Sequence, residues 1–136
     1  MAGGIDQTLA TAILANLSPN SGTGTTVTIT GPIKARLMTA NGSDTAAGTE
    51  LATSGGYTAG GSALSMGTAS AGSVTNSGGA TSWTSMPATT LTGVEQWTSD
   101  GTPKRTFWAP WSGGNISVAS GNTFTISSSG LTDSLA

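Results

Sequence analysis

The chain of 136 residues contains no histidine and no cysteine, and only 7% of its residues are charged. Ordinary soluble proteins carry about 25% charged residues. Enzymes commonly use groups that titrate near neutral pH, activated nucleophiles or clusters of metal ligands. With no imidazole, no thiol, six acidic and four basic residues, the sequence offers little material for such sites. We therefore expect a non-enzymatic protein without a cofactor, and disulfide bonds are excluded.

Two pairs of carboxylates are possible sites. Asp44 and Glu50 could offer oxygen atoms to a hard cation, but their spacing does not match an EF-hand loop. Local turn chemistry explains the polar residues of that segment just as well. Glu95 and Asp100 could form a glycosidase pair, but strand geometry places them roughly 17 Å apart, too far for that reaction. Neither pair predicts a catalytic site or a metal site.

The charge and the apolar pattern also exclude two kinds of partner. A net charge of −2 with only four basic residues provides no track for phosphates, so nucleic-acid binding is not expected. No apolar run approaches the roughly 20 residues of a membrane span. The N-terminal segment has no basic region and carries Asp6, which is not typical of a secretory signal.

Large apolar residues are scarce as well, at about a fifth of the chain, whereas serine and threonine make up roughly a third. The small net charge and the four tryptophans favour a folded chain over a disordered one. Domains with thin cores usually gain stability from a disulfide, a metal or a partner subunit. Because the first is excluded and the second lacks its common ligands, we expect a homo-oligomer.

Residues 4–17 predict a short helix with Asp6 in its first turn, where the helix dipole favours an acid. Four apolar residues recur at every fourth position and form one stripe: Ile5, Leu9, Ile13 and Leu17. We expect residues 1–24 to form this helix and a flexible tether, and residues 25–136 to form a β-sandwich domain. The stripe packs either on its own domain or, as an arm, on a neighbouring subunit; both alternatives remain open.

From Thr26 onward the pattern predicts β-strands. The segment 33–37 alternates apolar residues with Lys34 and Arg36, which is typical of a half-buried strand. Short strand candidates separated by glycine-rich connections follow at 50–52, 63–66, 72–76 and 80–85. This spacing favours an all-β fold, an antiparallel β-sandwich or jelly-roll-like single domain with the short N-terminal helical arm.

The dipeptide Asp100-Gly101 predicts a hairpin between residues 91–98 and 102–109. Centring the turn on it places Val94 opposite Phe107 on the core face. The expected reverse face carries Glu95, Trp97 and Lys104. A second hairpin is predicted between residues 115–119 and 123–127, with these side chains alternating inward: Phe124 and Ile126.

The four tryptophans divide into two pairs. Trp83 and Trp108 are expected to fill the core. Trp97, on the reverse face of the hairpin, and Trp111, which follows a proline, are expected to be partly exposed. Exposed indole rings stack on sugars or anchor a protein partner. The candidate partner-binding residues are therefore Ile5, Leu9, Ile13, Leu17, Trp97 and Trp111.

Several segments together resemble a family of small structural proteins of tailed bacteriophages, whose members are labelled tail-fibre or minor structural proteins. The segments are KARLMTANGSDTAAGTE at 34–50, SGGY at 54–57, SMP at 85–87, GVEQW at 93–97, TFWA at 106–109 and NTFTI at 122–126. The chain departs from the family pattern after Gly56, where an aromatic-Ala-Arg motif is usual, and at Pro110-Trp111.

The resemblance implies a virion protein. Its first implied role is decoration of the head surface as a homotrimer bound to the major capsid protein, after assembly in the host cytoplasm. The alternative role is a tail-tip or tail-fibre component that binds a host-surface glycan through exposed tryptophan.

Overall fold

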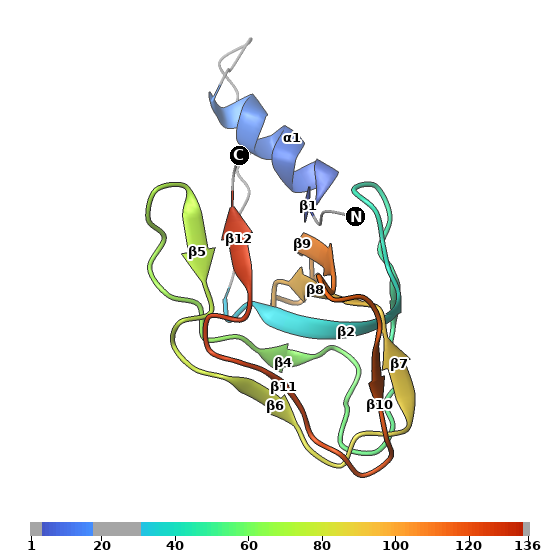
Figure 1. Ribbon diagram of the computed structural model, residues 1–136. Coiled ribbons are helices and arrows are strands. Elements are labelled where there is room, and N and C mark those ends of the chain that lie inside the picture. The colour runs from blue at the N-terminus through green and yellow to red at the C-terminus, as the bar shows by residue number, and fades with distance from the viewer. Residues whose placement is uncertain (1–3, 18–30, 135–136) are drawn as a thin grey trace.

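The computed structural model describes residues 4–17 and 31–134, and it has the predicted all-β, sandwich-like fold with one short N-terminal helix (Figure 1). The predicted tether lies outside the described residues, as does the side chain of Leu17. All strand pairs are antiparallel, and they form one large sheet and three two-stranded sheets.

The large sheet has six strands, and β2 is at its centre. Its strands in spatial order are β1 (Gly4–Ile5), β9 (Arg105–Pro110), β8 (Gly93–Trp97), β2 (Lys34–Ala40) and β3 (Thr49–Glu50), with β4 (Ser62–Ala63) also paired to β2. Ala35 and Leu37 of β2 are fully buried, whereas Lys34 and Arg36 are only half-buried. The predicted alternation of this strand is confirmed.

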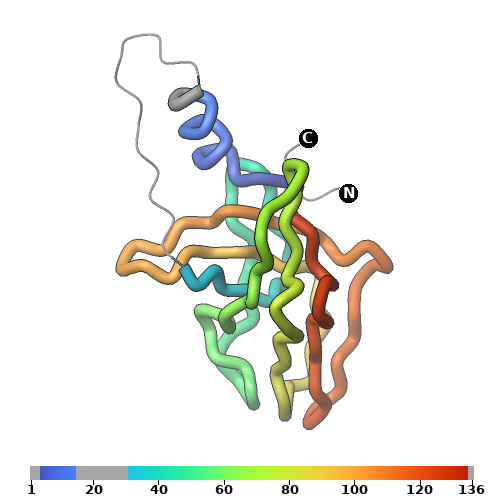
Figure 2. Tube along the Cα trace, turned by 90° about the vertical axis from the view of Figure 1, so that its left-hand side faces the viewer, coloured from blue at the N-terminus to red at the C-terminus, as the bar shows by residue number. Residues whose placement is uncertain are grey.

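The three small sheets form one long antiparallel ribbon. They pair β5 (Ser73–Thr75) with β12 (Thr132–Ser134), β6 (Thr81–Trp83) with β11 (Phe124–Ile126), and β7 (Thr89–Leu91) with β10 (Ile116–Val118). The register is the same in all three sheets: each step forward on one strand is matched by one step back on its partner, with no residue inserted between the sheets. Figure 2 shows the two halves of the ribbon side by side along the body. The β8–β9 hairpin forms the closed end of the ribbon and belongs to the large sheet.

The second predicted hairpin is wrong. Strands β10 and β11 pair with β7 and β6 and not with each other. Gly121 has a φ of 82° and bends the chain there, while its N–H donates to the carbonyl of Met86 at 2.8 Å. Because the ribbon ladder continues through Met86, the glycine-rich signal marks a bend and not a reversal. The predicted inward alternation of Phe124 and Ile126 is confirmed, since both are buried.

The Asp100-Gly101 hairpin exists as β8 and β9, but its predicted register is wrong by two residues. Val94 lies opposite Ala109 instead of Phe107. The loop is longer than a tight turn because Lys104 donates its backbone N–H to the hydroxyl of Thr98 at 2.8 Å, and a β-bulge follows at the start of β9. A side-chain bond of this kind is invisible in a pattern of apolar and polar residues.

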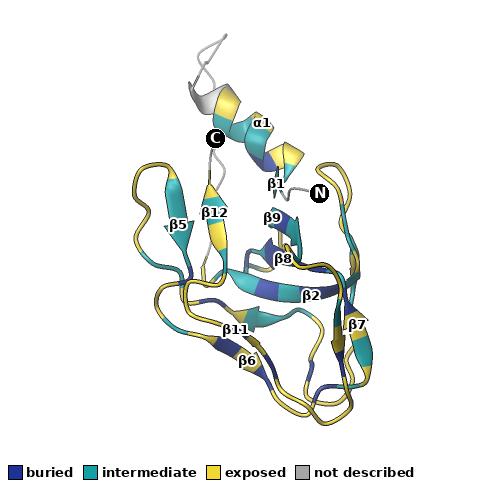
Figure 3. Ribbon diagram, in the orientation of Figure 1, coloured by how far each residue is buried: buried dark blue, intermediate teal, exposed yellow. Residues whose placement is uncertain are grey.

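The hydrophobic core contains residues from both the large sheet and the ribbon, and Figure 3 shows buried segments in β2, β6 and β8. Trp83 is 3% exposed, with its ring 6.3 Å from Tyr57 and 6.0 Å from Phe124 between ring centroids. The prediction that Trp83 fills the core is confirmed. The buried cluster is Ala35, Leu37, Leu51, Tyr57, Leu64, Trp83, Met86, Leu91, Val94, Val118, Phe124 and Ile126.

The predicted helix begins too early. Helix α1 spans Gln7–Leu17, and Ile5 lies in β1, opposite Phe107 of β9. Asp6 stands before the helix as its N-cap, because its carboxylate accepts the backbone N–H of Thr8 at 2.9 Å. The apolar spacing of four residues continues across this boundary, so it could not reveal that Gly4–Ile5 pairs with a strand far along the chain.

Candidate functional site

We call β1, Asp6 and α1 the arm (residues 4–17). Figures 1 and 2 show α1 extending beyond one end of the sheets, with only its first turn near the body. Leu9 is buried and Ile13 is half-buried. Leu14 is 64% exposed. Among the side chains that the structure describes, every other large apolar one is buried or half-buried. The arm therefore presents an apolar side chain to solvent.

Sequence reasoning missed Leu14, because the stripe of every fourth residue passes through Ile13. The signal that could have found it is the adjacent pair Ile13-Leu14, which makes the apolar surface wider than one narrow stripe. A short helix is marginally stable alone and gains most of its stability when its apolar surface packs on another element.

Arg105 fixes the base of the arm, and its side chain is 4% exposed. One terminal nitrogen, Nη2, donates to Asp6 Oδ2 at 2.8 Å and to the Ser43 carbonyl at 2.6 Å. The other, Nη1, donates to Glu95 Oε1 at 3.0 Å and to the Ala46 carbonyl at 2.6 Å. We call Arg105, Asp6 and Glu95 the anchor. A single guanidinium thus joins the arm, a loop and strand β8.

The anchor pairs one guanidinium with two carboxylates. Burial by itself would raise the pKa of Asp6, but the hydrogen bonds from Arg105 and from the Thr8 N–H, with the charge of Arg105, outweigh burial and hold the pKa below its ordinary value. Backbone bonds add to the fixation, since Asp6 N–H donates to the Thr106 carbonyl at 2.9 Å and Gln7 N–H to the Asp44 carbonyl at 3.0 Å. The direction in which α1 leaves the body is therefore set.

Glu95 lies on the opposite face of the large sheet from Val94, as predicted, yet it is only 1% exposed. Its carboxylate accepts the Gly48 N–H at 2.7 Å and the Trp97 indole N–H at 3.0 Å, in addition to Arg105. A loop and the arm cover this reverse face, which strand alternation alone cannot show. Trp108 is buried as predicted, but it lies outside the core cluster.

Trp97 and Trp111 are both half-buried, which confirms their partial exposure. The Arg36 guanidinium lies 4.2 Å from the Trp97 ring centroid and covers one face of it. Trp111 packs against the core, with its ring 5.6 Å from Phe124. The two tryptophans stand at opposite ends of the β8–β9 hairpin, so the structure does not bring them into one surface.

The carboxylates considered for a metal both have protein partners. Glu50 accepts the Tyr57 hydroxyl at 2.7 Å and pairs with Arg36 at 3.4 Å. Burial and the bond to Glu50 raise the pKa of Tyr57 above its ordinary value. Asp44 accepts the indole N–H of Trp108 at 2.9 Å. Over residues 4–17 and 31–134, no three acidic side chains gather in a group that could hold a metal ion.

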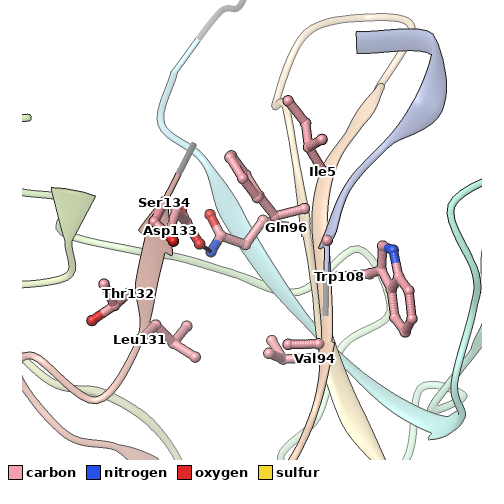
Figure 4. A pocket seen from close by; sticks show the side chains of 11 residues that line it. Ile5, Val94, Gln96, Trp108, Leu131, Thr132, Asp133 and Ser134 are labelled. Carbon is pink, nitrogen blue, oxygen red and sulfur yellow. Dashed lines mark hydrogen bonds between the residues drawn. The ribbon is translucent and has the colours of Figure 1, made fainter. Parts of the chain in front are cut away.

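A pocket of about 160 Å³ lies on the other side of the large sheet, against β12 (Figure 4). Among the described residues that line it, only Asp133 is titratable, and its Oδ1 accepts the side-chain amide of Gln96 at 2.6 Å. Burial raises the pKa of Asp133 from 3.8 to about 6, although the Gln96 bond opposes this. Sequence reasoning did not single out Asp133, because only the register of β12 with β5 brings it to the large sheet.

Asp133→Asn is expected to stabilise the protein by about 1 kcal/mol above pH 7, after allowance for solvent screening. The raised pKa means that the folded state holds its proton more tightly than the unfolded chain, so wild-type stability falls as the pH rises from about 4 to about 6. Urea unfolding at about pH 4 and above about pH 7 measures the effect. An equal gain at about pH 4 would contradict it.

Comparison of the chain with protein-family models, with curated proteins and with solved structures finds no match. In the described part of the chain, no helix has the length and apolar character needed to cross a membrane.

Proposed function

We propose that this protein is a non-enzymatic structural protein that joins a larger assembly through its helical arm. The observation that carries the proposal is the combination of an exposed Leu14 with a rigidly anchored helix base. An apolar side chain held out from the body in a fixed direction loses little conformational freedom on docking. A thin core and a surface rich in small neutral side chains support the same role, since such a surface is covered at low desolvation cost.

The assembly that we propose is a bacteriophage head, on which the protein decorates the major capsid protein as a homotrimer. This more specific proposal rests on the resemblance to small virion proteins. Each copy would stabilise the shell by about 25 cal/mol for every Å² of apolar surface that it buries. Repetition over many copies would make the summed stabilisation large.

A tail-tip or tail-fibre component that binds a host glycan is the second candidate. The observation that favours it is the partial exposure of Trp97 and Trp111. Because these residues stand at opposite ends of one hairpin, a glycan would contact one of them at a time. Copy number separates the candidates: hundreds of copies on the head support decoration, and a handful on the tail support glycan binding.

Leu14→Asp is expected to weaken binding to purified head particles at least tenfold, because it places a charge where the proposal requires apolar burial. Thr8→Asp is the matched control: it adds the same charge at an exposed position of α1 that does not share a face with Leu14, and it should leave binding nearly unchanged. Co-sedimentation with particles gives the number of bound copies. Equal occupancy for Leu14→Asp and wild type would overturn the role of the arm.

A further inference from the structure

The pocket beside β12 takes no part in the function proposed above. Its walls are about equally apolar and polar, and Figure 4 shows Ile5, Val94 and Leu131 around the side chains of Gln96 and Asp133. A volume of about 160 Å³ is close to that of cavities that hold a benzene molecule. The pocket is therefore large enough for one small organic molecule.

Asp133 gives the pocket its chemical character. Gln96 bonds Oδ1, and among the described residues no hydrogen bond to Oδ2 and no ion pair with lysine or arginine is found. The strands around it contribute no other charge: the pocket residues of β1, β8 and β9 are apolar or amide side chains, and β5, which pairs with β12, carries only Ser73, Val74 and Thr75.

We propose that this pocket binds a small organic cation, an ammonium group on an apolar body about the size of a benzene ring. The apolar body would cover the walls, and the ammonium would donate to the carboxylate of Asp133 as a charge-assisted hydrogen bond. A neutral ligand of the same shape would leave the carboxylate desolvated without a cation, and an anion would be repelled by it. The arrangement therefore discriminates by charge as well as by shape.

Benzylammonium is the probe that tests this site, and benzyl alcohol is its neutral match. With the full-length, isotope-labelled protein, NMR titration at about pH 7.5 should show a dissociation constant on the order of 1 mM for benzylammonium. The amides of β1, β8 and β12 should shift. Benzyl alcohol should bind at least fivefold more weakly at this pH, and its affinity should not fall when the pH is lowered.

The pH dependence gives an independent readout. Because the pKa of Asp133 is about 6, the carboxylate takes up a proton in acid, and benzylammonium should bind about tenfold more weakly at about pH 5 than at about pH 7.5. Equal affinities of the ammonium and the alcohol, or no shift of the pocket amides with either probe, would overturn the proposal.

Asp133→Asn removes the charge and keeps an oxygen that accepts from Gln96, so this variant is expected to fold. It should bind both probes alike and lose the pH dependence. Asp100→Asn, in the β8–β9 loop, is the matched control and should bind as wild type does. A charge preference that persists in Asp133→Asn would contradict the role of this carboxylate. None of these outcomes depends on docking of the arm, so the two proposals fail separately.

Discussion

Arg105→Met is expected to lower the free energy of unfolding by about 3–5 kcal/mol, because it leaves Glu95 as a buried charge without its cation. The same change removes the side-chain bonds that tie Asp6 to the body. We therefore expect faster amide hydrogen exchange at Asp6 and Gln7 as well as a lower denaturation midpoint. Chemical unfolding near neutral pH and hydrogen exchange measure these two effects.

Lys104→Met is the matched control for this prediction. Lys104 precedes Arg105 directly, its side chain is 58% exposed, and its nearest acidic partner, Asp100, is 3.9 Å away. Such a surface pair contributes less than about 1 kcal/mol. The double variant Arg105→Met with Glu95→Gln should recover part of the lost stability, since the most deeply buried carboxylate is then neutral and only the less buried Asp6 lacks its cation. A loss below about 1 kcal/mol for Arg105→Met would show that the anchor does not stabilise the fold.

Gly56→Ala is expected to cost about 3 kcal/mol, which is the upper part of the range for overpacking. A methyl group at this position would collide with the backbone carbonyl oxygen of Thr84. Gly56 also donates its N–H to the Ser85 carbonyl at 2.8 Å, so the two backbones cannot separate without losing this bond. Thermal and urea unfolding measure the change.

The control for this second prediction is Gly101→Ala at the tip of the β8–β9 loop. A methyl group there meets no atom within 4 Å, and stability should change by no more than about 0.5 kcal/mol. If Gly56→Ala were as mild as Gly101→Ala, the close approach of the two backbones would not be a constraint on the fold.

Local patterns in the sequence predicted the parts of the fold that depend on neighbouring residues. The alternation in β2 and the inward placement of Phe124 and Ile126 follow from side chains pointing to opposite faces of a strand. The predicted reversal at Gly121 failed, because a glycine with positive φ serves a bend as well as a turn. Register failed at the β8–β9 hairpin, where a bond to the Thr98 hydroxyl decides the loop length.

The candidate site was less accessible from the sequence, since its members meet only in the folded chain. The anchor joins Asp6 to Arg105, which are 99 positions apart. Burial of Glu95 depends on a loop that crosses the reverse face of the sheet, and the position of Asp133 depends on the register of the whole ribbon. The spacing of the apolar stripe correctly predicted that Leu9 is buried. It wrongly placed Ile5 in the helix, whereas Ile5 lies in strand β1.

The separation of Asp6 and Arg105 has a consequence for the timing of maturation. During translation, Asp6 leaves the ribosome 99 residues before the guanidinium that positions it. Contacts over such long loops form late, because closing the loop costs entropy before any bond compensates for it. A nascent chain therefore carries an unoriented helix until its sheet is complete. If the arm docks on a neighbouring molecule as proposed, docking by unfinished copies is thereby disfavoured.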